Sequence, residues 1–520
     1  MCAAAARGVV VLVSVLGVQA APQADLVEAL PGWDKPLLSK AYSGYIPVGM
    51  EDGLTMYEHY LFFESENDPA TDPVIMWTNG GPGASSLFGS FTELGPYYLS
   101  GASVLTSAYN STGVPTLFEN KWRWTKLGSL IVRNLPPPVG FSYCDPVGPA
   151  GDGNSCGSWN DTKTAKHSYE FMKGFMKAFP EYSKNSLFIT GESYAGLYVP
   201  MLVREIIENP SGEGAGLFAQ LKGFAVGDGC LGGSNDISGV GSCTPNLGPY
   251  FEVEFFHGHG QFSDKTYAEI QTSCGKELVD GVKSDACKAA LQKMDAEKGF
   301  SFDYNLYDEC FDFSLGTKPW HEQRTWWGPP RMSSAAKGLS SGSSDWHMDG
   351  TPCGGGGALA KWVNNSKVKA ALHVSPLAYF FTGDNGVGFT YNLTEPSLVP
   401  WYKEVTAKSN LRIMIYNGDT DPGLNSFYAQ NWTVAVGLPE SEPWRPWTRD
   451  GKIRMGGFVT RYKSAGAFDF ITIRGSGHMV PEYKPEAAFV MLQSFVTGAD
   501  FPKYSPQPEE GHLSFETTIV

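Results

Sequence analysis

The stretch that decides the fold reads Ser186-Leu-Phe-Ile-Thr-Gly-Glu-Ser-Tyr-Ala-Gly-Leu-Tyr-Val-Pro200. Its apolar run at 187–189 predicts a buried strand, and helical spacing resumes from 197 to 208. The turn between them places Ser193 at its apex, with the hydroxyl at the N-terminus of the helix. This order predicts a nucleophile elbow. The pattern G-x-S-x-G is incomplete, however, because Ala195 stands at its second glycine, and the serine could instead only cap a helix.

Strand-like and helical segments alternate on both sides of this stretch. Such alternation predicts an α/β fold, with a mostly parallel central sheet covered by helices on both faces. A region of alternating pattern at 41–65 should add antiparallel strands. The expected sheet strands lie at 73–77, 130–132, 221–226, 411–416 and 468–473, and the expected helices at 164–179 and 485–497.

The alternation stops between 228 and 357, where cysteines, glycines and aromatic residues accumulate. We interpret this segment as a largely helical, disulfide-containing cap insertion, so that the α/β core comprises residues 21–227 and 358–520. Within the insertion, residues 333–345 are rich in serine and glycine. That composition predicts a flexible, exposed linker that proteases could cut, leaving one chain or two.

The composition is typical of a large globular protein, with 42% hydrophobic and 13% aromatic residues in a chain of 520. The net charge of -15 and the isoelectric point near 5.1 argue against nucleic acid or an anionic membrane as a partner. The same acidity suits a protein that works in acidic surroundings, where part of its carboxylates are protonated.

Residues 1–20 predict a cleavable signal peptide. They combine Arg7, an apolar stretch too short to span a bilayer, and small residues around Ala20. Five glycosylation sequons fit the same secretory route, at Asn110, Asn160, Asn364, Asn392 and Asn431. We therefore expect the protein in the vacuole or lysosome, or outside the cell.

Eight of the nine cysteines follow the predicted signal peptide, and an even number in a secreted chain predicts disulfides. Pairing of neighbouring cysteines would give four disulfides: Cys144 with Cys156, Cys230 with Cys243, Cys274 with Cys287, and Cys310 with Cys353. No pair shows the C-x-x-C spacing of a zinc site, and His257 and His259 have no third ligand nearby. We therefore expect neither a metal nor another cofactor.

A serine hydroxyl is a weak nucleophile and needs a base that a carboxylate orients. Two loops after later strands supply both groups: Asn417-Gly-Asp-Thr-Asp-Pro-Gly423 offers Asp419 and Asp421, and Arg474-Gly-Ser-Gly-His-Met-Val-Pro481 offers His478. Either aspartate could instead close a turn. The order Ser, Asp, His at the carboxyl ends of strands is nevertheless the one expected of an α/β-hydrolase.

The glycine-rich loop Asn79-Gly-Gly-Pro-Gly83 follows its own strand and exposes backbone N–H groups. One of these and the N–H of Tyr194 could form an oxyanion hole. Alternatively, the glycines serve only a tight turn. A phosphate-binding loop is less consistent with the sequence, because no Lys-Ser/Thr follows.

Several long motifs in one order resemble the serine carboxypeptidase family over nearly the whole chain after the signal peptide. The family's own elbow reads Gly-Glu-Ser-Tyr-Ala-Gly, which accounts for Ala195. The motifs are Trp77-Thr-Asn-Gly-Gly-Pro-Gly-Ala-Ser-Ser86, Phe91-Thr-Glu-Leu-Gly-Pro96, Gly140-Phe-Ser-Tyr143, Gly191-Glu-Ser-Tyr-Ala-Gly196, Tyr416-Asn-Gly-Asp-Thr-Asp421 and Gly475-Ser-Gly-His-Met-Val-Pro481.

The resemblance implies a role for each matching position. Ser193 would be the nucleophile, His478 the general base and then acid, and Asp421 the orienting carboxylate, with Asp419 a structural neighbour. Gly81 and Tyr194 would supply the oxyanion N–H groups. The side chains expected to hold the terminal carboxylate of a substrate are those of Asn79, Glu93 and Glu192.

Three positions depart from the family pattern. Ala84 replaces a cysteine of the oxyanion loop, and the expected partner cysteine after residue 374 is also missing, so we expect packing to hold the loop. Pro138 replaces a glycine, which puts the shape of the substrate pocket in doubt. Asp228 stands where asparagine is common.

The function implied is that of a serine-type carboxypeptidase releasing C-terminal amino acids from peptides and proteins at acidic pH through an acyl-enzyme. Two alternatives stay open: an acyltransferase that uses the same triad to acylate an alcohol, and a protective binding protein for other hydrolases. The resemblance also favours a homodimer. The residue preferred at the substrate terminus is left open by the sequence.

Overall fold

The computed structural model describes residues 21–233, 249–299, 301–308, 355–383 and 388–505. The predicted signal peptide at 1–20 and the predicted linker at 333–345 lie outside the described residues. Within these ranges, no helix is both long enough and apolar enough to cross a membrane.

The centre of the molecule is a twelve-stranded sheet in the order β1-β2-β3-β7-β4-β10-β11-β13-β16-β15-β14, with β8 beside β3. Its six middle strands, from β7 to β16, run parallel. They are buried and apolar because helices cover both faces, which confirms the predicted parallel centre. The middle strands are β7 (Ser129–Arg133), β4 (Val74–Thr78), β10 (Leu187–Glu192), β11 (Leu221–Gly227), β13 (Arg412–Gly418) and β16 (Ala467–Ile473).

Antiparallel strands extend this centre at both edges. At one edge, β2 and β3 arise from the predicted region at 41–65, whereas β1 and β8 lie outside it. At the other edge, the sequence analysis predicted neither β14 nor β15. The outermost strand, β14, contains two prolines and charged residues, which suit a sheet edge but do not give a strand-like pattern; it reads Glu-Ser-Glu-Pro-Trp-Arg-Pro-Trp-Thr. The edge strands are β1 (Leu26–Val27), β2 (Ala41–Glu51), β3 (Leu54–Phe63), β8 (Tyr143–Asp145), β14 (Glu440–Thr448) and β15 (Met455–Tyr462).

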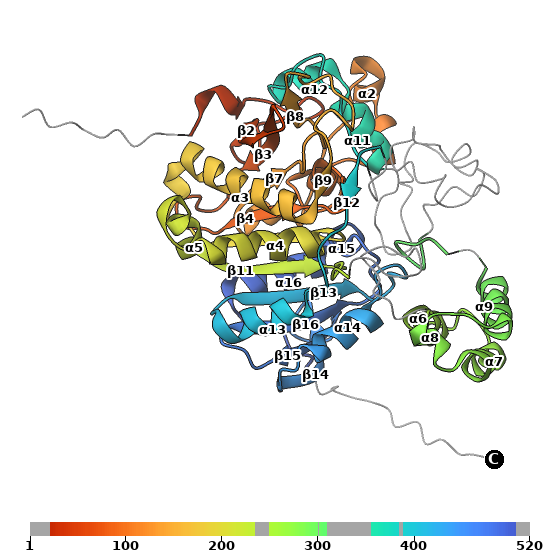
Figure 1. Ribbon diagram of the computed structural model, residues 1–520. Helices are drawn as coiled ribbons and strands as arrows, with labels where there is room; N and C mark the ends of the chain where they lie inside the picture. Colours follow the sequence, from red (N-terminus) through yellow and green to blue (C-terminus); the bar gives the residue numbers. More distant parts are fainter. Residues whose placement is uncertain (1–20, 234–248, 300, 309–354, 384–387, 506–520) are drawn as a thin grey trace, which may run out of the picture.

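Helices cover the two faces of the sheet and enclose two apolar cores (Figure 1). One face carries α3 (Asp161–Ala178), α4 (Ala195–Glu208), α5 (Ala215–Gln220), α13 (Val399–Lys408) and α14 (Ser426–Ala435). The other carries α1 (Leu87–Thr92), α11 (Gly355–Val363), α15 (Val480–Tyr483) and α16 (Pro485–Thr497). This three-layer arrangement is that of an α/β-hydrolase, as predicted. Outside these layers lie α2 (Ser107–Thr112), α12 (Ser366–Ala371) and two small sheets, β5 (Tyr97–Tyr98) with β6 (Phe118–Glu119) and β9 (Trp159–Asn160) with β12 (Tyr391–Asn392).

The described part of the predicted insertion is helical and has its own small core. It contacts the α/β core where Phe251 packs edge-on against Tyr428 of α14, with ring centroids 5.4 Å apart. The division of the chain into core and cap remains a prediction. The four helices are α6 (Tyr250–Gly258), α7 (Asp264–Cys274), α8 (Glu277–Asp280) and α9 (Asp285–Lys298).

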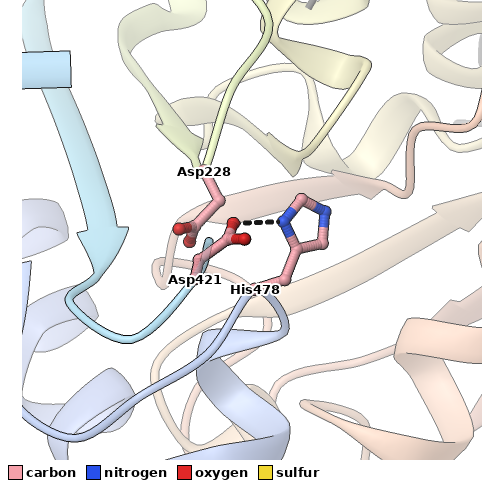
Figure 2. A group of neighbouring side chains, drawn as sticks. All are labelled: Asp228, Asp421 and His478. Carbon is pink, nitrogen blue, oxygen red and sulfur yellow. Dashed lines mark hydrogen bonds and ion pairs between the residues drawn. The ribbon is translucent and has the colours of Figure 1, made fainter. Parts of the chain in front are cut away.

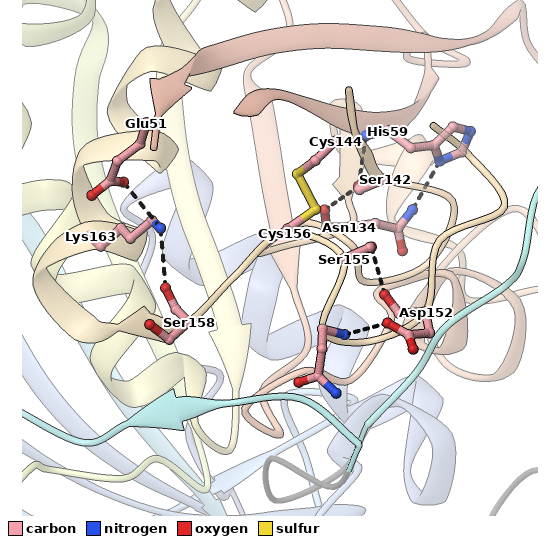
Figure 3. The surroundings of a disulfide bond; sticks show 11 residues. Glu51, His59, Asn134, Ser142, Cys144, Asp152, Ser155, Cys156, Ser158 and Lys163 are labelled. Carbon is pink, nitrogen blue, oxygen red and sulfur yellow. Dashed lines mark hydrogen bonds and ion pairs between the residues drawn. A yellow bond between two sulfur atoms is a disulfide. The ribbon is translucent and has the colours of Figure 1, made fainter. Parts of the chain in front are cut away.

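Two of the predicted disulfides are confirmed. Cys274–Cys287 joins α7 to α9 in the cap. Cys144–Cys156 joins β8 to the loop before α3 (Figure 3). Nearby, Lys163 in the first turn of α3 forms an ion pair with Glu51 and donates a hydrogen bond to the carbonyl of Ser158 in that loop. Cys230 is also disulfide-bonded. The predicted pairs 230–243 and 310–353 include cysteines outside the described residues and remain predictions.

Candidate active site

Ser193 occupies the sharp turn between β10 and α4, with a positive φ of 63° that a side chain rarely adopts. Backbone hydrogen bonds hold it there: its N–H donates to Gly227 at 2.9 Å, and its carbonyl accepts from Cys230 at 3.0 Å. Neither of the two flanking glycines has room for a side chain. A Cβ at Gly191 would lie 2.5 Å from the Thr78 carbonyl, and one at Gly196 would lie 2.1 Å from that of Cys230. The predicted elbow is therefore present.

The structure distinguishes the two candidate aspartates. Asp421 Oδ2 lies 2.7 Å from His478 Nδ1, and its Oδ1 accepts the N–H groups of Gly423 and Leu424 at 2.9 and 3.3 Å. Asp419 instead accepts the Gly475 N–H at 2.6 Å and links its loop to the histidine loop. Only Asp421 orients the imidazole.

His478 is held by Tyr304, which sequence reasoning did not identify. The His478 N–H donates to the Tyr304 carbonyl at 2.7 Å, and the two rings meet edge to face at 4.9 Å. The other ring nitrogen, Nε2, is buried and has no hydrogen-bond partner among the described residues. It faces a pocket that Ser193 also lines. No signal in the local sequence around Tyr304 points to this role.

The glycine-rich loop lies directly against the start of α4. A Cβ at Gly80 would stand 2.2 Å from the Tyr194 nitrogen, so only glycine permits this approach. Gly81 follows with φ 110°, and both glycines line the pocket with Ser193. Backbone of the loop and the amide of Tyr194 are thus brought together, as an oxyanion hole requires.

Hydrogen bonds hold this loop in place of the missing disulfide. The Gly83 carbonyl accepts the N–H of Gly383 at 2.8 Å, and the Ser85 N–H donates to Thr382 Oγ1 at 3.2 Å. On its other side, Ser85 Oγ donates to Asn134 Oδ1 at 2.5 Å. The expectation that packing holds the loop remains a prediction, and these hydrogen bonds are further contacts of the loop.

Asn79 joins the two glutamates of the predicted carboxylate site. Its Oδ1 accepts from Trp77 Nε1 at 2.9 Å and from the Gly89 N–H at 3.1 Å. The Nδ2 group is thereby turned to donate to Glu93 Oε1 at 3.1 Å and Glu192 Oε1 at 2.8 Å. The remaining Oε2 atom of each glutamate is buried and accepts no hydrogen bond among the described residues.

Glu93 and Glu192 are buried side by side, and this raises the pKa of both carboxyl groups. Burial raises the pKa of Glu93 to about 7. The pKa of Glu192 is raised well above its usual value, first by burial and then by the charge of Glu93. At acidic pH the pair therefore carries protons that can be donated in hydrogen bonds.

One further acid stands beside the triad. Asp228, at the end of β11, has an oxygen that lies with atoms of Asp421 and His478 inside a 4.8 Å cluster (Figure 2). The Asp421–His478 hydrogen bond and the bonds of Asp228 to Gly418 and Asn417 account for the approach of the three groups. The expectation of no metal stays a prediction.

The family model described as "Serine carboxypeptidase" matches residues 31–498. This chain belongs to the serine carboxypeptidase family. It is a hydrolase of the serine-type carboxypeptidase class, whose substrates are peptides or proteins.

Relatives cover this carboxypeptidase almost from end to end. Serine carboxypeptidase 1 of Hordeum vulgare is 30% identical over 511 residues, which cover 92% of this chain and 94% of the barley protein. The lysosomal protective protein of Mus musculus is also 30% identical, over 496 residues with the same shares. Kex1Δp, a prohormone-processing carboxypeptidase from Saccharomyces cerevisiae, superimposes with a TM-score of 0.64 at 18% identity, over 93% of this chain and 99% of that one, and shows the fold.

The pocket of this carboxypeptidase brings together most of the positions predicted for chemistry. Glu93 and Asp421 do not line it but bond to residues that do, Asn79 and His478, and Tyr194 directly follows the lining residue Ser193. Ser193, His478, Gly81, Asn79 and Glu192 all line it. The walls also include four residues to which the sequence analysis gave no role: Phe88, Tyr304, Thr382 and Met479.

Proposed function

We propose that this carboxypeptidase releases single residues from peptide C-termini at acidic pH, with Ser193, His478 and Asp421 as its catalytic triad. The observation that carries the proposal is one pocket that holds the elbow serine, the carboxylate-oriented histidine and, bound by Asn79, the carboxyl pair. A nucleophile beside a carboxylate-binding site limits attack to the last peptide bond.

The reaction would proceed in two halves. His478 Nε2 takes the Ser193 proton while Oγ attacks the scissile carbonyl, and N–H groups of Gly81 and Tyr194 stabilise the oxyanion. The imidazolium then protonates the leaving amine, and the terminal amino acid departs. Water repeats the sequence against the acyl-enzyme, releasing the shortened peptide and restoring the serine.

The free carboxylate of the substrate would bind at Asn79, Glu93 and Glu192. Two ionised glutamates would repel it, whereas protonated ones donate hydrogen bonds to it. Because the pKa of Glu93 is about 7, binding should weaken as the pH rises through neutrality. The acidic optimum would therefore appear in KM more than in kcat.

The decisive experiment compares release of a free amino acid from a blocked dipeptide and from its C-terminal amide at pH 5. Cleavage of the acid, poor cleavage of the amide and loss of several powers of ten in rate in Ser193→Ala support both the nucleophile and the carboxylate site. Equal cleavage of acid and amide would remove the carboxylate site from the proposal.

Acyl transfer to an alcohol would use the same triad. Adding glucose esters as donors to that assay separates the alternatives, since an acyltransferase would make a new ester rather than free amino acid. A protective role would show as co-purification of another hydrolase with Ser193→Ala. No contact among the described residues favours either alternative.

A secretory route is part of the proposal. The exposure of the five sequon asparagines then bears on which of them would carry a glycan. Asn110, Asn364, Asn392 and Asn431 are exposed, as a glycan requires. Asn160 is half-buried, and its side chain caps α3 by accepting the Lys163 N–H at 2.8 Å. We therefore expect Asn160 to carry less glycan than the other four. Lysosome or vacuole as the destination, and a homodimer, remain proposals from family resemblance.

A further inference from the structure

Two buried carboxyl groups meet directly behind the triad histidine. Asp228 and Asp421 are both fully shielded from solvent, and their carboxyl oxygens lie together in the cluster shared with His478 (Figure 2). Asp228 is held there by its backbone, with φ 41° and an N–H that donates to the Tyr416 carbonyl at 2.8 Å. Two adjacent carboxylates in a buried site cannot both be ionised without a large cost, so one proton is shared between them.

The hydrogen bonds decide where that proton resides. Asp421 accepts three N–H groups, two from backbone and one from the His478 ring. Asp228 accepts only two N–H groups among the described residues: that of Gly418, shared between Oδ1 at 3.0 Å and Oδ2 at 3.2 Å, and the side-chain amide of Asn417 at 3.3 Å. Because the richer set of donors stabilises the ionised form, Asp421 is the carboxylate and Asp228 the acid.

The rest of the surroundings points the same way. Besides Asp421, the titratable groups that act on Asp228 are Glu192 at the end of β10 and Tyr416 of β13, with His478 beyond Asp421. These neighbours are acidic or neutral when His478 is the free base. Burial, followed by the charge of Asp421, raises the pKa of Asp228 well above its usual value.

We propose that Asp228 is a positioning residue that carries the shared proton and donates a hydrogen bond to Asp421, keeping the triad carboxylate ionised and aimed at His478. The inference rests on the proposed function, in which Asp421 orients the general base. It also accounts for the departure at position 228, because asparagine would offer a neutral donor of the same shape.

The test compares Asp228→Ala with Asp228→Asn, using kcat and KM for a blocked dipeptide at pH 5. Loss of the donor in Asp228→Ala should lower kcat roughly ten- to hundredfold with little change in KM. The amide of Asp228→Asn should restore most of that loss. Equal loss in both variants would overturn the proposal, because it would mean that position 228 acts as a carboxylate; so would wild-type kcat in Asp228→Ala.

A second measurement separates positioning from mere stability. Asp469→Ala removes another buried aspartate, one on β16 that pairs with Arg461 of the neighbouring edge strand β15, and should lower the melting temperature without lowering kcat. Asp228→Asn has no proton to lose, so its kcat should persist to at least the alkaline limit of the wild type. A limit moved to lower pH would contradict the proposal. Failure of the proposed function would appear separately, as activity retained in Ser193→Ala.

Discussion

Asp421 Oδ2 and His478 Nδ1 lie 2.7 Å apart, although 57 residues separate them in the chain. The parallel strands β13 and β16 are neighbours, and each of the two residues follows the carboxyl end of its strand. In the proposed mechanism, the contact orients the imidazole and stabilises the imidazolium that would form when Ser193 is deprotonated. It therefore supports the first prediction.

Asp421→Asn should lower kcat by roughly 10³- to 10⁴-fold, because an amide permits the wrong tautomer and no longer stabilises the charged ring. KM should change little, and kinetics with a blocked dipeptide at pH 5 would show both. The matched control is Asp419→Asn, two residues away and bonded to Gly475 instead of the histidine. A loss in the control as large as in Asp421→Asn would contradict the assignment of Asp421.

Gly80→Ala should nearly abolish activity while leaving the sheet intact. The added Cβ would stand 2.2 Å from the Tyr194 nitrogen and force the glycine-rich loop away from the elbow. Displacement of an oxyanion donor should cost at least roughly a hundredfold in kcat. Gly216→Ala, in helix α5 with no heavy atom within 4 Å of the new Cβ, serves as the control and should keep full activity. Full activity in Gly80→Ala would exclude the loop from catalysis.

Glu93→Gln should flatten the dependence of KM on pH. In the wild type the pKa of Glu93 is about 7, so its deprotonation adds a negative charge beside the substrate carboxylate and KM should rise through neutral pH. Glutamine stays neutral and cannot add that charge. Measurement of KM from pH 4 to 8 for both proteins decides the matter. A wild-type KM that is constant over this range would remove the protonated pair from the mechanism.

Glu482→Gln should make stability less dependent on pH. Burial, then the charges of Glu93 and Asp308, raise the pKa of Glu482 well above its usual value. The folded protein therefore binds a proton that the unfolded chain releases above its own pKa of about 4.5, and the free energy of unfolding falls as pH rises through and beyond that value. Urea unfolding at pH 4.5 and 7.5 should show a smaller decrease in the variant. An equal decrease would mean that Glu482 is ionised in the folded protein.

The middle strands of the sheet and most of the candidate site residues could be predicted from the local sequence. Hydrophobic runs placed the middle strands because those strands are buried on both faces and read as continuous apolar segments. The sequence did not predict β14, whose prolines and charges suit a sheet edge, nor the contact of Tyr304 with His478, which lie far apart in the chain. Such contacts depend on where distant segments meet, and no local pattern encodes that.

By itself, the sequence determined that Ser193 sits in an elbow and that an aspartate and a histidine follow in hydrolase order, because glycine spacing and apolar runs reflect local backbone sterics and burial. The residues alone left Asp419 and Asp421 open and the family resemblance implied Asp421; the tertiary structure shows that both follow the same strand and that the Asp421 carboxylate is the one that reaches the imidazole. The tertiary structure alone placed the carboxyl of Asp228 beside that of Asp421. Protonation in a buried site depends on which groups share it, and that is set by the packing of strands remote in the chain.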